Sequence, residues 1–141
     1  MPISFVIHGA PRGKGRPRFG VVRGRATAFT DKQTVAYERT IQSAARSVMA
    51  TREPLDGPVW VRINIFIQIP VSAPKWKQAQ MRDGSIRPTR TPDADNVAKA
   101  VLDGINGVVF ADDKQVVGMG VTKFYSDHAR VEVTVGEVSH G

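Results

Sequence analysis

The sequence predicts an α+β fold: a mixed β-sheet with two main helices packed on it, in the order β-α-β-α-β-β. Three observations support this prediction. The length of 141 residues suits one compact domain, residues 1–141, with no internal repeat. Apolar residues alternate along several segments, as they do in half-buried strands, and two other segments carry apolar residues at helical spacing. Strand and helix signals that alternate along the chain favour helices packed on a sheet.

The first half of the chain predicts two strands and one helix. Alternating apolar residues predict a strand over 3–8, and a Gly-Ala-Pro sequence ends it. The Gly- and Arg-rich segment 12–25 has no apolar period, so we expect an extended basic loop there. Thr30, followed three residues later by a glutamine, is a capping-box signal for a helix over about 31–50. The clearest strand is 59–69, where β-branched residues occupy every second position.

The second half predicts one more helix and the remaining strands. Apolar residues at helical spacing predict a helix over about 95–106, and the glycine that follows is a natural helix terminator. A short strand is expected over 108–110. Segments 115–125 and 129–135 alternate in polarity around a polar turn, and we expect them to pair as a hairpin.

Composition excludes several functional classes. The chain has no cysteine, so a disulfide framework, a thiolate metal site and a cysteine nucleophile are all excluded. No apolar run has the roughly 18 residues that a membrane span needs, and the N-terminus lacks the pattern of a signal peptide. We therefore expect a soluble, cytoplasmic protein without a membrane partner.

The charge of the chain is unevenly distributed. The formal net charge is +7, but residues 1–52 hold ten Lys or Arg and two acids, while residues 53–141 hold ten Lys or Arg and eleven acids. A basic half favours an anionic partner, most simply nucleic acid. Two segments supply the candidate phosphate contacts, the loop 12–25 and the long connection 70–92, which we expect to contain a short helix from Pro74. Their candidate DNA-binding residues are Lys14, Arg16, Arg18, Arg23, Arg25, Arg87 and Arg90.

Five aspartates lie close together between positions 93 and 113, and they need a separate explanation. Asp93 and Asp95 stand two residues apart at the predicted helix start, so both carboxylates can face one site if the chain is extended there. Converging carboxylates repel one another unless a cation lies between them, and Mg²⁺ suits oxygen ligands together with substrate phosphates. Such an ion supports phosphodiester hydrolysis, and a nearby lysine can stabilise the transition-state charge.

Each acidic element also has a purely structural interpretation. Asp95 is well placed as an N-cap. Asp95, Lys99 and Asp103 follow one another at intervals of four residues and can form an exposed ion-pair ladder. The Asp112-Asp113 pair is typical of a turn, and the basic loop can be solvated without binding anything. The occurrence of three acidic elements within 21 residues of a basic protein favours the metal site.

Two stretches resemble the RusA family of Holliday junction resolvases. The specific one is residues 92–117, which read PDADNVAK, then Asp103, then FADDKQVV, and match the family pattern D-x-D-N-x-x-K…D…D-D-x-Q-V. The other is the front of the chain, GKGRPRF from Gly13 and the later Tyr37-Glu38, which resembles the phage-borne branch. Some members carry a dense arginine run before the first aspartate, whereas this chain has only Arg87 and Arg90 there.

The resemblance implies a homodimeric, Mg²⁺-dependent endonuclease that cuts four-way DNA junctions in paired strands, with Mn²⁺ as an alternative ion. It further implies catalytic and metal-binding carboxylates at Asp93, Asp95 and Asp113, a catalytic lysine at Lys99, and less defined roles for Asp103 and Asp112. The Gly13-Lys14-Gly15 sequence lacks P-loop spacing, so no nucleotide cofactor is expected. Two alternatives remain open, a nucleic-acid-binding module without catalysis and a nuclease for other branched or flap DNA.

Overall fold

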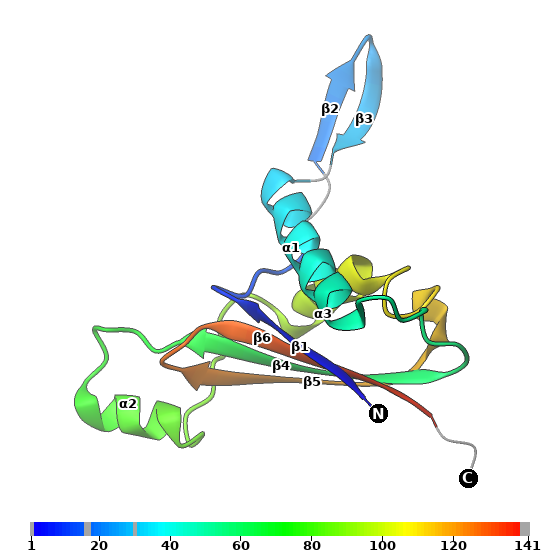
Figure 1. Cartoon of the computed structure of the whole chain (residues 1–141). Helices are drawn as coiled ribbons and strands as arrows, with labels where there is room; N and C mark the ends of the chain where they lie inside the picture. The colour runs from blue at the N-terminus through cyan, green and yellow to red at the C-terminus, as the bar shows by residue number, and fades with distance from the viewer. Residues whose placement is uncertain (1, 16–17, 30, 139–141) are drawn as a thin grey trace.

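The computed structural model describes residues 2–15, 18–29 and 31–138. Its elements are β1 (Ile3–His8), β2 (Arg18–Val22), β3 (Arg25–Phe29), α1 (Lys32–Met49), β4 (Val59–Gln68), α2 (Lys75–Arg82), α3 (Ala94–Ile105), a 3₁₀ turn η1 (Asp113–Gln115), β5 (Val116–Ser126) and β6 (Arg130–Glu137). The predicted fold class is confirmed: helices pack on a four-stranded mixed sheet, and the β2–β3 hairpin forms a separate two-stranded unit (Figure 1).

The strand order in the main sheet is β1-β6-β4-β5. β4 pairs antiparallel with β6 and parallel with β5, and β1 pairs antiparallel with β6. The predicted hairpin between 115–125 and 129–135 is therefore wrong, because β4 lies between its two strands. The polar turn after Ser126 carries the chain across the end of β4, where the Ile69 N–H donates to the Ser126 carbonyl at 3.0 Å.

The core lies between one face of the sheet and helices α1 and α3, which sit on the same side of it (Figure 1). Alternate residues of β4 point into this core and are fully buried, among them Ile63 and Ile65. The two helices pack closely where Gly104 of α3 meets Ile41 of α1, and a Cβ built on Gly104 would lie 2.6 Å from Ile41 Cγ2. This close approach explains a glycine inside a helix, where it costs about 1 kcal/mol relative to alanine.

Several local predictions need correction. Segment 12–25 is not one irregular loop, because β2 and β3 pair through a two-residue turn at Arg23 and Gly24, whose φ angles are +51° and +77°. Such turns match the twist of the flanking strands. The expected strand 108–110 is absent from the described residues, and Phe110 makes only isolated bridges.

The helix ends also differ from the expectation in detail. Asp31 is the N-cap of α1, and its side chain accepts a hydrogen bond from the Gln33 N–H at 3.3 Å. Thr30, which the sequence favours as that cap, lies outside the described residues. The short helix expected from Pro74 is present as α2, and Met81 of that helix is buried with Ile69 and Tyr125 beside the end of the sheet.

Candidate active site on helix α3

Helix α3 begins one residue earlier than its sequence suggests. Asp93 is the N-cap residue, and its carbonyl accepts the first intrahelical hydrogen bond from the Val97 N–H at 3.1 Å. The prediction that Asp95 caps this helix is wrong, because Asp95 already lies in the first helical turn. An acidic residue there is stabilised by the positive end of the helix dipole.

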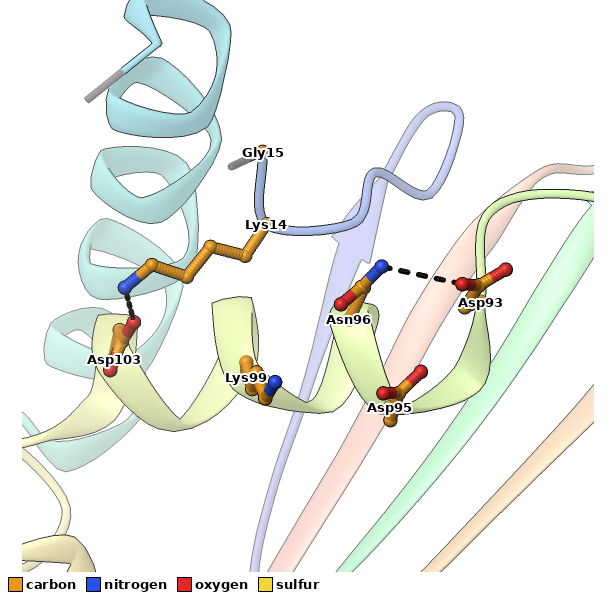
Figure 2. Close-up of a pocket in the computed structure, with 7 residues that line it drawn as sticks. All are labelled: Lys14, Gly15, Asp93, Asp95, Asn96, Lys99 and Asp103. Atoms are coloured by element: carbon orange, nitrogen blue, oxygen red, sulfur yellow. Dashed lines mark hydrogen bonds and ion pairs between the residues drawn. The ribbon is translucent and has the colours of Figure 1, made fainter. Parts of the chain in front are cut away.

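The side chains of Asp93 and Asp95 nevertheless face the same pocket (Figure 2). The expected extended backbone is found at Asp93, whereas Asp95 already has helical backbone geometry. The Asp93 side chain makes no capping hydrogen bond, and its nearest described partner is the Asn96 amide at 3.5 Å. Both carboxylates are exposed. They are therefore available to a ligand.

The pocket has a volume of about 540 Å³ and runs along the exposed side of α3. Lys99 and Asp103 follow Asp95 along the helix at intervals of one turn (Figure 2). Among the described ion pairs, none joins Lys99 to either aspartate, so the predicted ladder is not formed. The residues that line the pocket are Lys14, Gly15, Asp93, Asp95, Asn96, Lys99 and Asp103.

Lys14 enters this pocket from the N-terminal segment. Its ammonium group forms an ion pair and a hydrogen bond with the Asp103 carboxylate, and its Nζ lies 3.8 Å from Glu38 Oε1 on α1. The hydrogen bond to Asp103 raises the pKa of Lys14, so the group stays protonated. Burial raises the pKa of Glu38, and the positive charge of Lys14 opposes that shift.

The Asp112-Asp113 pair lies in the turn before β5. Asp112 is the N-cap of η1, and its side chain accepts a hydrogen bond from the Lys114 N–H at 3.0 Å, which lowers the pKa of Asp112. The structural interpretation of Asp112 is thus supported. The side-chain interaction with Asp112 raises the pKa of Asp113, and the negative charge of Asp103 adds to the effect. Of the α3 carboxylates, Asp103 is the one whose charge acts on Asp113.

Gln115 shapes this turn with all of its hydrogen-bonding groups. Its side-chain oxygen accepts from the Ala111 N–H at 2.9 Å and from the Asp112 N–H at 3.0 Å. Its amide nitrogen donates to the carbonyls of Leu55 at 3.0 Å and Gly57 at 2.9 Å. Gln115 belongs to the acidic sequence motif, which by itself assigns it no role. The structure shows that it ties the Asp112-Asp113 turn to the segment before β4.

Carboxylates of this kind suit a hard divalent cation. Asp93 and Asp95 take part in none of the ion pairs found among the described residues, and Asp113, on the η1 turn, is not among the residues that line their pocket. Within the described part of the chain, no three acidic or histidine side chains are already gathered closely enough to ligate one ion. Mg²⁺ does not require such a cage, because it binds through one or two carboxylates together with waters and phosphate oxygens.

The structure divides the candidate DNA-binding residues into two groups. Arg23 and Arg25 belong to the β2–β3 hairpin, which projects away from the body of the protein (Figure 1), and Arg18 begins its first strand. Arg16 lies outside the described residues. Arg87 instead lies over the Phe124 ring at 4.1 Å and donates to the Lys123 carbonyl at 2.8 Å.

The contacts of Arg87 fasten the long connection to β5. Lys123 adds to this attachment by donating to the carbonyl of Arg90. The connection ends at Asp93, so these contacts also hold the entry to α3.

None of the helices in the described residues is long and apolar enough to cross a membrane.

Comparison with known proteins gives two matches. The family model for endodeoxyribonuclease RusA matches residues 8–136, a range that includes both the front motif and the acidic motif. An uncharacterized protein of Bacillus subtilis (strain 168), YqaN, is 36% identical over 139 residues, which cover 97% of this chain and 97% of that protein.

Proposed function

The chain belongs to the RusA family of endodeoxyribonucleases, and from this membership we propose that it resolves four-way DNA junctions by Mg²⁺-dependent hydrolysis of paired strands. The observation that supports the proposal is the pocket on α3, which Asp93, Asp95 and Lys99 line together with Lys14 and Gly15, a few residues before the arginine-bearing β2–β3 hairpin. Exposed carboxylates can hold a metal ion and basic side chains can contact phosphates, and metal-assisted cleavage of DNA uses both.

Each pocket residue has a chemical role in this proposal. Asp93, Asp95 and Asp113 hold the ion, which supplies an activated water and neutralises charge on the scissile phosphate. The Lys99 ammonium lies one helical turn beyond Asp95, where it stabilises the negative charge that develops on the phosphate oxygens. Asp112 acts on the turn that carries Asp113 rather than on the ion.

A homodimer suits this substrate. A four-way junction has near two-fold symmetry, and a C₂ dimer supplies two equivalent sites for two symmetrical cuts. The hairpin arginines of both subunits contact phosphates and read the branched shape rather than the base sequence. We expect no nucleotide cofactor, a cytoplasmic location, and Mn²⁺ as an alternative to Mg²⁺.

The direct test compares wild type with Asp95→Asn on a synthetic four-way junction, with Mg²⁺ or with EDTA. We expect Asp95→Asn to cut at least about 100-fold more slowly, because it removes one ligand charge, and we expect EDTA to stop cleavage by wild type. Asp83→Asn is the matched control, since Asp83 is an exposed acid of the 70–92 connection and should leave cleavage unchanged.

The other outcomes identify other functions. Equal cutting by Asp95→Asn and wild type would refute the metal site. Tight binding of junctions without any cleavage would indicate a binding module, and faster cleavage of flaps or forks in competition would indicate a different branched substrate.

A further inference from the structure

The segment Gly13–Gly15 is wedged between the two helices that frame the pocket. The Lys14 N–H donates to the Asn96 carbonyl of α3 at 3.0 Å, and the Gly15 N–H donates to Thr34 Oγ1 of α1 at 3.0 Å. A Cβ built on Gly13 would lie 2.9 Å from Asn96 Cβ, and one built on Gly15 would lie 3.0 Å from Thr34 Oγ1. The two glycines thus allow the backbone to approach both helices closely.

The lysine between them extends along α3 and is partly exposed. Figure 2 shows its side chain running parallel to the helix from the backbone near Asn96 to the carboxylate of Asp103. A second acid faces the same ammonium, because Glu38 Oε1 is buried, lies 3.8 Å from Lys14 Nζ and has no hydrogen-bond partner among the described residues. Without Lys14, two carboxylates would stand close together with no cation between them.

This arrangement divides the carboxylates of the pocket into two kinds. Asp103 has a fixed cationic partner within the chain, whereas neither Asp93 nor Asp95 has one among the described residues. Only the second kind is left for a metal ion. The hydrogen bonds of Lys14 and Gly15 also hold their segment against both helices.

We propose that Lys14 is a positioning residue, which neutralises Asp103 and Glu38 at one end of the pocket. It thereby fixes the Gly13–Gly15 segment against α3 and reserves Asp93 and Asp95 for the metal. The inference rests on the proposed function, in which the pocket cuts DNA. In this role the Lys14 ammonium pairs with carboxylates of its own chain, whereas in a simple phosphate contact it would bind the DNA.

A double-mutant cycle tests this role. The variants are Lys14→Met, which removes the charge at similar length, Lys14→Arg, Asp103→Asn, and Lys14→Met combined with Asp103→Asn. Lys75→Met, an exposed lysine of α2, is the control for loss of one positive charge. The measurements are the junction Kd in EDTA and the single-turnover cleavage rate at saturating enzyme across a Mg²⁺ titration.

We expect Lys14→Met to lower the saturated cleavage rate about 30-fold or more while the Kd rises no more than about threefold. Asp103→Asn alone should stay within about threefold of wild type, and the double variant should recover most of the lost rate, because the carboxylate left unpaired has been removed. Lys14→Arg should keep most of the activity, since it can still pair with Asp103.

Two results would overturn the proposal. A Lys14→Met variant that binds junctions weakly but cuts normally at saturation would make Lys14 a phosphate contact. An Asp103→Asn variant that is itself inactive would make Asp103 a metal ligand.

Amide hydrogen exchange gives a readout that does not depend on cleavage. The amides of Lys14 and Gly15 should exchange about tenfold faster in Lys14→Met than in wild type, and at the wild-type rate in Lys75→Met. If wild type cuts no junction, the proposed function fails while the exchange result still decides whether Lys14 anchors the segment. Unchanged exchange in Lys14→Met would refute the anchoring.

Discussion

Single residues in this protein act mainly by fixing other residues. Asp93 and Asp95 are exposed, and their positions depend on where α3 starts and on the contacts that hold the preceding connection. Gln115 fixes the position of the Asp112-Asp113 turn, because its four hydrogen bonds join that turn to the segment before β4. The sequence indicated the acidic side chains directly, whereas residues such as Gln115 become identifiable only when their partners are known.

Replacing Gln115 should therefore affect both stability and catalysis. In Gln115→Ala, backbone groups of the turn and of the segment before β4 lose their partners, and we expect the free energy of unfolding to fall by about 2 kcal/mol or more. Cleavage should fall as well, because Asp113 loses its fixed position. Urea denaturation and single-turnover cleavage measure the two effects.

The control for this substitution is Gln80→Ala, an exposed residue of α2 that should change stability by less than about 0.5 kcal/mol. A Gln115→Ala variant as stable as the control would show that the turn is held by other contacts.

At the scale of elements, the β2–β3 hairpin stands out because it extends away from the rest of the chain (Figure 1). Isolated two-stranded hairpins are only marginally stable in water, so an external partner is expected to stabilise this one. Its sequence did not indicate strands, because glycines and arginines interrupt the alternation that marks a half-buried strand. The turn at Arg23 and Gly24 defines how the two strands pair.

The salt dependence of DNA binding tests the role of the hairpin. Each neutralised phosphate contributes about 0.9 to the slope of log K against log salt, so replacing Arg18, Arg23 and Arg25 with glutamine should reduce the slope by about 2 to 3. The control variant replaces Arg39, Arg46 and Arg52, on the exposed side of α1 and in the segment after it, with glutamine. This variant should reduce the slope by less than about 1. Equal reductions in the two variants would mean that only net charge matters.

At the scale of the whole molecule, one face of the sheet is covered by α1 and α3, and the other carries a mixed polar and aromatic surface. There Phe66 and Phe124 stack with centroids 5.2 Å apart, and Arg130 and Arg87 lie over their outer faces. The pocket on α3 lies on the helical side of the sheet, and the β2–β3 hairpin extends from that same side (Figure 1).

The proposed homodimer makes a further prediction for cleavage. In a population of dimers formed from wild-type and Asp95→Asn subunits, mixed dimers should cut one strand of a junction and leave the opposite strand intact. A supercoiled cruciform plasmid then yields nicked circles from mixed dimers and linear products from wild-type dimers. Linear product from mixed dimers at the wild-type rate would show that one site makes both cuts.

The sequence by itself determined the local features. Periodicity placed α1, α3 and β4, because burial of one face imposes a repeat that is visible without knowing the partner. The acidic motif marked the side chains of the site, since their chemistry belongs to the residues themselves. The tertiary structure decided the insertion of β4 between β5 and β6, the capping of α3 by Asp93 instead of Asp95, and the ion pair of Lys14 with Asp103. These features depend on contacts between residues far apart in the chain. The polarity pattern of one segment shows that it has a buried face, but it does not show which distant segment packs against that face.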